Sequence, residues 1–244
     1  MKKAIIIQAR MTSTRLPGKV MMDLAGRPML AQQIARLKRC REVRDIVIAT
    51  TVNDADNPVV ELAKSEGIRC FRGDEQDVLS RFLGAARQEE ADLIVRLTAD
   101  CPLIDPGLID QIIHQIEAHR HECDYASNVI ERTFPRGLDA EAFFFDTLER
   151  IDRLASSTPA REHVTWLILR EHPELFLTRS VVDSTINSDL RWTVDVQEDL
   201  DMLRRLYQEL NLASSFKSYA DIRAYVRAHP AIAAMNATVA QKVL

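Results

Sequence analysis

The sequence predicts an α/β fold with a doubly wound, mixed but mostly parallel sheet that is covered by helices on both faces. Short β-branched runs alternate with amphipathic segments of helix length through the first half of the chain. These runs are apolar almost throughout, as in strands that are buried on both faces. The length of 244 residues, with 46% hydrophobic and 28% charged residues, fits one large soluble domain.

The first half of the chain supplies four expected strands and four expected helices. The strands are "AIIIQ" (4–8), "DIVIATT" (45–51), "IRCF" (68–71) and "DLIVRLT" (92–98). The helices between and after them cover residues 29–39, 58–66, 77–89 and 106–119. In a sheet of this kind, ligands bind outside the carboxyl ends of the strands. We therefore expect the segments that follow the first and fourth strands to meet at one crevice.

The pattern changes after Cys123. Residues 124–182 hold strand-like pieces, a Pro-Arg-Gly turn, an aromatic run at Phe143 to Phe145, and helical patterns near 147–154 and 159–171. We predict a small inserted lobe over 124–182 within a single domain that spans 1–244. Residues 190–210 then predict one more strand, ending at Asp195, and a strongly periodic helix that returns the chain to the sheet.

Composition excludes several classes of partner. A formal net charge of −4 and a pI near 5.9 oppose general attraction to nucleic acid or to an acidic membrane surface. No apolar stretch reaches the ~18 residues of a membrane span, and the first apolar run is too short for a signal peptide. The four cysteines lack a CxxC pair, which predicts reduced thiols. We expect a cytoplasmic protein with no nucleic-acid or membrane partner.

Residues 8–20, "QARMTSTRLPGKV", follow the first strand directly and are called the opening loop below. Arg10, Arg15 and Lys19 stand here among three hydroxyl residues, a set of donors suited to a polyphosphate. The segment is not a P-loop, because Ser13 replaces the required glycine and Val20 replaces the hydroxyl residue that binds Mg²⁺. If the loop binds a polyphosphate together with a metal ion, the ligands of that metal must come from elsewhere in the chain. The alternative to phosphate binding is that residues 8–20 form a solvated, charged loop.

Two aspartates are candidate metal ligands. Asp100 follows the fourth expected strand and Asp195 ends the last one, so the two carboxylates can converge at the strand ends. One or two carboxylates, with phosphate oxygens and water, are the usual ligands of Mg²⁺. The alternative is helix capping for both, with Glu198 completing a capping box after Asp195.

A series of motifs resembles one family. The segments are "QARMTSTRLPGKVMMDLAGRPML", "IVIATT", "FRGDEQDVLSRF", "RLTADCPLIDP", "YASN", "PRGLDAEAF", "REHVT" and "RWTVDVQEDL", in this order from about residue 4 to 210. Together they are similar to the cytidylyltransferases of spore-coat polysaccharide biosynthesis, relatives of the acylneuraminate (CMP-sialic acid) and CMP-Kdo synthetases. The resemblance implies a nucleotide-diphospho-sugar transferase-like fold. It also implies transfer of CMP from CTP to a sugar, mainly a sugar acid, with release of pyrophosphate, for surface polysaccharide or glycan biosynthesis.

The resemblance also implies roles for particular residues, and association into a homodimer through the lobe. The aromatic run at Phe143 to Phe145 independently suggests that this lobe needs a partner surface. The implied residues are Arg10, Ser13, Arg15 and Lys19 for the triphosphate, Gln8, Ala9 and Arg72 for the base, Asp100 and Asp195 for Mg²⁺, and Arg136, Asp139, Glu141 and His163 for the acceptor. His163 has a packing or helix-end role as its alternative. Arg136 is expected to pair with a carboxylate of the acceptor.

Three rival functions remain. A GT-A glycosyltransferase would use a DxD motif, and the chain has Asp54-Ala55-Asp56. A nucleotide-binding module without catalysis would be expected to lack Lys19 or one of the two candidate metal aspartates, and all three are present. A sugar-1-phosphate nucleotidylyltransferase would begin with the glycine-rich G-x-G-T-R-L, where this chain has "ARMTSTRL".

Overall fold

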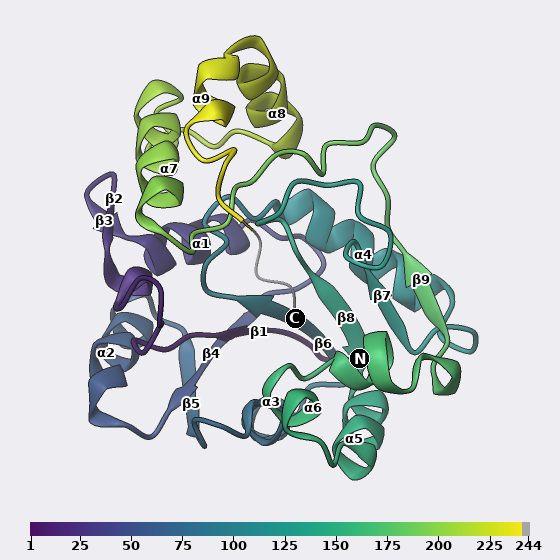
Figure 1. The fold of residues 1–244 in the computed structure, drawn as a ribbon. Helices are drawn as coiled ribbons and strands as arrows, with labels where there is room; N and C mark the ends of the chain where they lie inside the picture. Colours follow the sequence, from purple (N-terminus) through teal and green to yellow (C-terminus); the bar gives the residue numbers. More distant parts are fainter. Residues whose placement is uncertain (241–244) are drawn as a thin grey trace.

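The computed structural model describes residues 1–240 and contains one seven-stranded sheet in the order β5-β4-β1-β6-β8-β7-β9 (Figure 1). Its strands are β1 (Lys3–Gln8), β4 (Asp45–Thr51), β5 (Arg69–Gly73), β6 (Leu93–Thr98), β7 (Tyr125–Ser127), β8 (Glu141–Phe144) and β9 (Thr178–Ser180). Strands β5, β4, β1 and β6 are mutually parallel, whereas β8 is antiparallel to both of its neighbours. The predicted mixed, mostly parallel sheet is confirmed.

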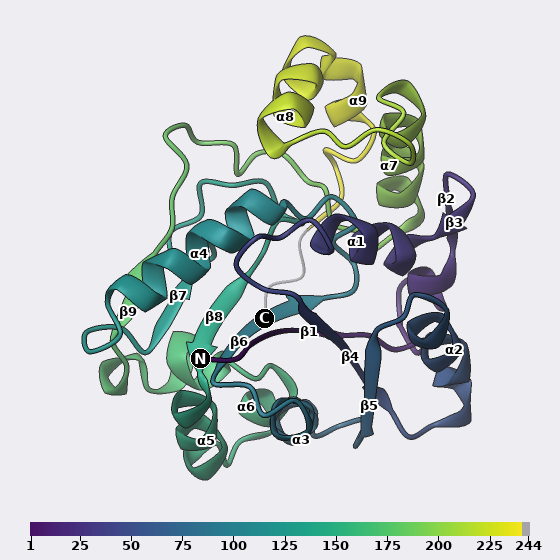
Figure 2. The ribbon, with the colours of Figure 1, turned by 180° about the vertical axis from the view of Figure 1, so that it is seen from behind.

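Helices cover both faces of this sheet. They are α1 (Met29–Leu37), α2 (Asn57–Ser65), α3 (Val78–Gln88), α4 (Pro106–Ala118), α5 (Phe145–Leu154), α6 (Thr158–Glu162), α7 (Gln197–Glu209), α8 (Tyr219–Ala228) and α9 (Pro230–Ala234). Short elements complete the chain: 3₁₀ turns η1 (Lys19–Met21), η2 (Asp54–Asp56) and η4 (Pro173–Leu175), a π-helical turn η3 (Leu167–Glu171), and the hairpin of β2 (Asp23–Leu24) with β3 (Arg27–Pro28). Figures 1 and 2 show α3, α5 and α6 on one side of the strands and α1, α4 and α7 on the other.

The apolar strand sequences explain this layering. Along β1, Ile5 and Ile7 pack into the core beneath α1 and α4, whereas Ala4 and Ile6 pack into the core beneath α3 and α5. All four side chains are fully buried. Alternate strand residues point to opposite faces, so a strand covered on both sides must be apolar at every position. Strand β1 is accordingly apolar at every position between its two end residues, Lys3 and Gln8.

Residues 124–182 join the main sheet through β7, β8 and β9, and the segment's helices α5 and α6 pack against α3. The aromatic run lies in the protein's own core, because Phe143 is 0% and Phe144 5% exposed. The run is therefore covered internally and does not call for a partner surface. The single domain predicted over 1–244 includes four residues that lie outside the described part of the chain.

The strand expected to end at Asp195 is wrong. Residues 190–195 run extended, but in the described chain they form only a single bridge, between Arg191 and Arg136. The backbone of this segment bonds to loop residues instead, because the Trp192 N–H donates to the Arg136 carbonyl and the Val194 N–H to the Asp100 carbonyl. In the part of the chain that the structure describes, no helix is long and apolar enough to cross a membrane.

Candidate active site

The opening loop leaves β1 at Gln8 and is held in place by a neighbouring turn. Asp56 is 1% exposed, and its carboxylate accepts hydrogen bonds from the backbone N–H of Met11 at 2.6 Å and from the Thr51 hydroxyl at 2.5 Å. Gly18 adopts a left-handed φ of 71° and donates its N–H to the Met11 carbonyl at 2.8 Å. The loop is thereby folded back so that Lys19 begins η1 and faces the sheet.

Lys19 lies between the two predicted metal ligands. Its ammonium Nζ is 3.0 Å from Asp100 Oδ2 and 3.1 Å from Asp195 Oδ1, and it donates to the Val194 carbonyl at 2.5 Å. Since both carboxylate oxygens lie about 3 Å from the same nitrogen, they are no more than about 6 Å from each other. Residues that are far apart in the sequence therefore converge at the carboxyl ends of the strands, as predicted.

The electrostatic balance of this cluster fixes its charges. Burial alone would lower the pKa of Lys19, but the carboxylates of Asp100 and Asp195 outweigh it, so the Lys19 pKa is raised. Burial would likewise raise the pKa of Asp100, yet the Lys19 ammonium and a hydrogen bond from Thr98 bring it below its ordinary value. The site therefore carries a protonated lysine and an ionised Asp100 at neutral pH.

Arginines hold Asp195 from two further directions. Arg15 reaches it from the opening loop, with its Nη2 at 2.8 Å from Oδ1, and Arg191 donates to Oδ2 at 2.9 Å. Arg191 is itself fixed by Asp199, whose Oδ1 accepts its Nε–H at 2.8 Å. Asp199 also accepts from the Asp195 backbone N–H at 2.9 Å, which ties the start of α7 to the site.

The capping alternatives are not realised. The N-cap of α4 is Asp105, five residues after Asp100. Helix α7 begins at Gln197, and Asp199 takes the place predicted for Glu198 in bonding the backbone before the helix. Neither Asp100 nor Asp195 is therefore used as a helix cap, and both carboxylates face the cluster around Lys19.

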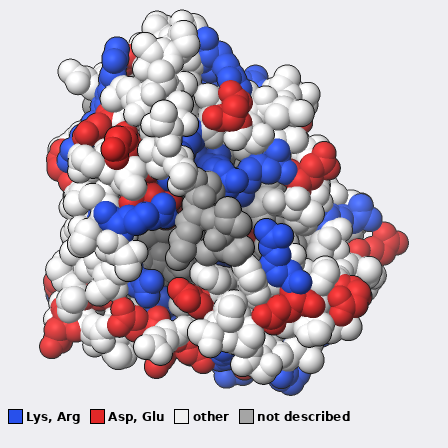
Figure 3. Space-filling view, viewed as in Figure 1, with Lys and Arg blue, Asp and Glu red and all other residues white. Residues whose placement is uncertain are grey.

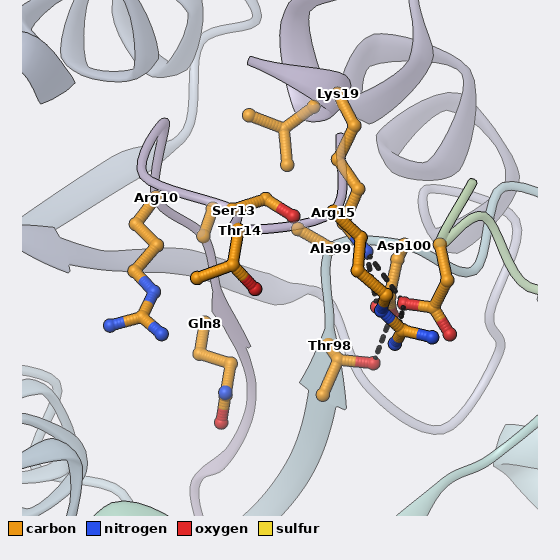
Figure 4. Close-up of a pocket in the computed structure, with 12 residues that line it drawn as sticks. Gln8, Arg10, Ser13, Thr14, Arg15, Lys19, Thr98, Ala99 and Asp100 are labelled. Carbon is orange, nitrogen blue, oxygen red and sulfur yellow. Dashed lines mark hydrogen bonds and ion pairs between the residues drawn. The ribbon is translucent and has the colours of Figure 1, made fainter. Parts of the chain in front are cut away.

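A pocket of about 210 Å³ opens beside this cluster. It is lined by Gln8, Ala9, Arg10, Ser13, Thr14, Arg15, Lys19, Val20, Thr98, Ala99, Asp100 and Asp195. Lys19 and Arg15 reach toward Asp100, while Gln8 and Arg10 lie at the other end of the pocket (Figure 4). On the face seen in Figure 1, several lysine and arginine side chains lie around the middle of the molecule (Figure 3). The pocket lining itself holds three basic and two acidic residues, in a chain whose net charge is −4.

Eight of the predicted site residues are brought together here, and Arg72 is not. The Arg72 guanidinium is committed to the end of β4, where it donates to the carbonyls of Thr51 at 2.9 Å and Asn53 at 2.8 Å. Its third hydrogen bond goes to Asn57 at 3.0 Å. These bonds fix the turn that carries Asp56, and Arg72 is absent from the pocket lining.

The four residues predicted for the acceptor lie outside the main pocket. Asp139 forms a two-pronged ion pair with Arg132 at 2.7 and 2.9 Å. Glu141 is 6% exposed and is enclosed by protein donors, and the His163 ring lies 5.7 Å from that of Trp166. These three side chains are engaged within the protein and do not face the pocket.

Arg136 is the exception among them. It lines a small pocket of about 120 Å³ on the other side of residues 190–191, and no hydrogen bond or ion pair of its guanidinium is present among residues 1–240. Burial, and then the neighbouring Arg132, lower its pKa. Its backbone bonds to Leu190 and Trp192 place it on the segment that leads to Asp195.

Sequence reasoning missed several residues of the site. Thr98 stands two residues before Asp100 and donates to its Oδ1 at 2.6 Å, a link that the "RLTAD" motif could have suggested. Arg191 precedes Asp195 and Asp199 by four and eight residues, a spacing that predicts ion pairs within a helix, whereas residues 190–195 are not helical. The Val194 carbonyl had no sequence signal, because its contact with Lys19 depends on the tertiary fold.

Comparisons with known proteins identify the family. The family model described as "Cytidylyltransferase" matches residues 4–222. The spore coat polysaccharide biosynthesis protein SpsF of Bacillus subtilis is 33% identical over 211 residues, which cover 84% of this chain and 85% of that protein. The 3-deoxy-manno-octulosonate cytidylyltransferase of Chloroherpeton thalassium is 33% identical over 115 residues, 46% of this chain and 45% of that protein.

The solved structures agree with this assignment. The structure of a cytidylyltransferase from Leptospira borgpetersenii serovar Hardjo-bovis aligns with a TM-score of 0.90 and 32% identity, covering 100% of this chain and 99% of that chain. The similarity therefore includes the opening loop, the sheet and the C-terminal helices alike. The chain belongs to the cytidylyltransferase family and is an enzyme of the nucleotidyltransferase class.

Proposed function

We propose that this enzyme transfers CMP from CTP to a hydroxyl group of a sugar acid and releases pyrophosphate. The observation that carries the proposal is the pocket at the strand ends, where Lys19 and Arg15 contact the two aspartates and Arg10 lines the opposite end. In such a reaction the acceptor oxygen bonds to the α-phosphorus, the bond to the β-phosphate breaks, and the hydroxyl proton leaves to solvent. Positioning and charge neutralisation are the main requirements.

The two aspartates fit a Mg²⁺ site. An oxygen of each carboxylate contacts the same Lys19 ammonium, so the two side chains face a common point, and hard carboxylate oxygens are the ligands that Mg²⁺ prefers. Asp100 is held by Thr98 and Asp195 by Arg191, so each carboxylate is oriented by a second group. Bound there, Mg²⁺ would supply charge neutralisation on the phosphoryl oxygens.

The basic residues of the opening loop are proposed to bind the triphosphate of CTP. Lys19 and Arg15 now neutralise the two carboxylates, and both side chains line the pocket, from which they can turn to phosphate oxygens. Arg10 and Ser13 line the same pocket nearer the Gln8 end and are suited to the remaining phosphate oxygens. Lys19 is positioned to stabilise the departing pyrophosphate, where negative charge builds as the bond breaks.

The acceptor is proposed to be a sugar acid because of Arg136. A half-buried guanidinium that has no carboxylate partner among residues 1–240, next to a second arginine, favours an incoming anion. The names of the relatives from Bacillus and Chloroherpeton support surface-polysaccharide or glycan chemistry. The four cysteines are free thiols, which supports a cytoplasmic location.

The Asp-Ala-Asp motif does not support the glycosyltransferase alternative, because its aspartates are not both placed to bind a metal ion. Asp56, the second aspartate of "DAD", is buried and uses its carboxylate to hold Met11 and Thr51. Asp54 lies on the exposed turn before it. A metal-binding DxD needs both carboxylates at the ligand, so this motif supports the opening loop instead.

The proposed function is tested by pyrophosphate release across the four nucleoside triphosphates, with a panel of sugar acids and matched neutral sugars as acceptors. We expect release that requires both CTP and a sugar acid. Transfer from a finished nucleotide sugar, without pyrophosphate, would support the glycosyltransferase alternative. Binding of CTP without any turnover, across the whole panel, would support the non-catalytic module.

We also propose that the protein is a homodimer joined through residues 124–182. The support is the sheet edge at β9, which no other strand of residues 1–240 pairs with, together with exposed apolar side chains on both sides of it. The exposed residues in and next to this segment are Ile130, Leu175, Leu177, Val182 and Ile186.

Light scattering at micromolar concentration checks this association. We expect a dimer for the wild type and a monomer for the double variant Leu175→Glu/Leu177→Glu, because two charges would be buried in the interface without partners. Val52→Glu is the matched control, since Val52 is 62% exposed and lies far from this segment in the sequence. A monomeric wild type would rule the dimer out.

A further inference from the structure

A chain of hydrogen bonds runs across the sheet from Gln8 to residues that the pocket does not contain. The Arg96 guanidinium donates to Gln8 Oε1 at 3.0 Å through one nitrogen and to Glu141 Oε2 through another. Glu141 Oε1 accepts two more hydrogen bonds, from the Tyr125 hydroxyl and the Thr165 hydroxyl, each at 2.9 Å. Arg96 and Glu141 are direct partners in the β6–β8 register, so the strands themselves align the pair.

This chain fixes the direction of the Gln8 amide. A guanidinium can only donate hydrogen bonds, so the amide oxygen of Gln8 must face Arg96 and its NH₂ group must face away. A flipped amide would place NH₂ against NH₂ and leave Arg96 without an acceptor. Arg96 has no freedom to follow, because its side chain is 13% exposed and Glu141 holds it on the other side.

The NH₂ group of the Gln8 amide is available to a ligand in the pocket. Gln8 is one of the residues that line it, at the end away from Asp100 (Figure 4). Among residues 1–240, no hydrogen bond uses Gln8 Nε2. The pocket is thus supplied with a group that donates hydrogen bonds and does not accept them.

We propose that Arg96, held by Glu141, is a positioning residue that makes Gln8 a selector of cytosine over uracil. The inference rests on the proposed use of CTP. Cytosine presents two neighbouring acceptors, the O2 carbonyl and the N3 ring nitrogen, whereas uracil carries an N–H at position 3. An amide NH₂ fixed toward the base can bond to cytosine N3 but meets a second donor in uracil.

The energetics explain why the direction of one amide has a large effect. A site built to hydrogen-bond one partner rejects an analogue mainly because its own buried polar groups are left unpaired. A freely rotating glutamine would avoid that penalty by presenting its oxygen to uracil. Arg96 removes this freedom, at the cost of an Nε–H that is buried without a partner.

The first test replaces the hydrogen-bond donor of Gln8 by an acceptor. In Gln8→Glu, the carboxylate can still accept from Arg96 but offers an acceptor to the base in place of the donor. We expect the ratio of kcat/KM for CTP to that for UTP to fall by about 100-fold, with the same trend in the Kd values from calorimetric titration. An unchanged ratio in this variant would overturn the inference.

The second test removes the positioning residue while the glutamine stays. Arg96→Met alone would leave Glu141 buried and unpaired, so it is combined with Glu141→Gln to keep the fold. The amide of Gln8 is then free to rotate, and we expect the CTP-to-UTP ratio to fall by about 10-fold, mainly through better use of UTP. A purely structural role for Arg96 would lower both activities and leave the ratio unchanged.

Arg87→Met is the matched control, because Arg87 is 60% exposed and pairs only with Glu149 on the surface. It is expected to keep the wild-type ratio. The proposed function and this inference fail in different ways. A wild type that binds neither CTP nor UTP contradicts both, whereas a wild type that uses the two equally well contradicts the selector alone.

Discussion

Lys19→Ala is expected to lower kcat by about 100-fold, which corresponds to ~3 kcal/mol of transition-state stabilisation. The ammonium is placed to interact more strongly with departing pyrophosphate than with bound CTP, so KM should change less than kcat. Lys19→Arg should recover only part of the rate, since a planar guanidinium cannot occupy the compact ammonium's place between Asp100 and Asp195. The measurement is steady-state pyrophosphate release with CTP and an acceptor.

The same substitution should also destabilise the protein. From the sequence, Lys19 reads as an exposed loop cation whose loss leaves stability unchanged, but the structure shows it 8% exposed between two carboxylates. Its removal leaves Asp100 without a cation, and we expect the free energy of unfolding to fall by about 2 kcal/mol. Urea denaturation measures this loss.

A double variant separates the two effects. In Lys19→Met/Asp100→Asn both members of the pair become neutral, so stability should return toward that of the wild type while turnover stays low. Near-normal kcat in Lys19→Ala would contradict the triphosphate role. Recovery of both stability and turnover in the double variant would show that Lys19 acts only on the fold.

Gly137→Ala is expected to cause the largest loss of stability, about 3 kcal/mol or more. Gly137 has a φ of 101°, and a Cβ there would lie 2.4 Å from the backbone nitrogen of Thr193 and from the carbonyl carbon of Trp192. The backbone would have to move apart where the Pro-Arg-Gly turn packs against residues 190–194. Since this segment leads to Asp195, we expect turnover to fall as well.

Gly67→Ala is the control that measures the cost of a left-handed backbone conformation without a Cβ clash. Gly67 also has a left-handed φ, of 68°, but nothing lies within 4 Å of a Cβ built on it. Its substitution should cost only about 1 kcal/mol. If urea denaturation shows the same loss of unfolding free energy in both variants, the close contact with Thr193 does not contribute to the cost of Gly137→Ala.

The sequence could predict the parts of the fold that depend on local pattern. Strand β4 occupies the expected residues 45–51, and α4 covers 106–118 against an expected 106–119. The convergence of Lys19 and Asp100 followed from one rule, that parallel strands end at the same edge of the sheet. Asp195 joins them although the described chain has no strand directly before it, because the Val194 N–H bonds to the Asp100 carbonyl.

What could not be predicted depends on contacts between distant segments. Residues 190–195 have the composition of a strand, but among the described residues they form a single bridge, with Arg136 as its partner. The motif around Glu141 resembles that of a substrate-binding residue. The register of β6 and β8 places Glu141 opposite Arg96, and its carboxylate pairs with that guanidinium inside the sheet. Phe143 and Phe144 read as a surface for a partner until the sheet and α5 cover them.

The most direct test of the account is a crystal structure with CTP and Mn²⁺, which replaces Mg²⁺ and is located by its anomalous signal. The account predicts one ion in contact with Asp100 and Asp195, the triphosphate along residues 10–19, and Lys19 turned from the two carboxylates to phosphate oxygens. A nucleotide bound elsewhere, or an ion that contacts neither aspartate while Lys19 keeps both bonds, would contradict it.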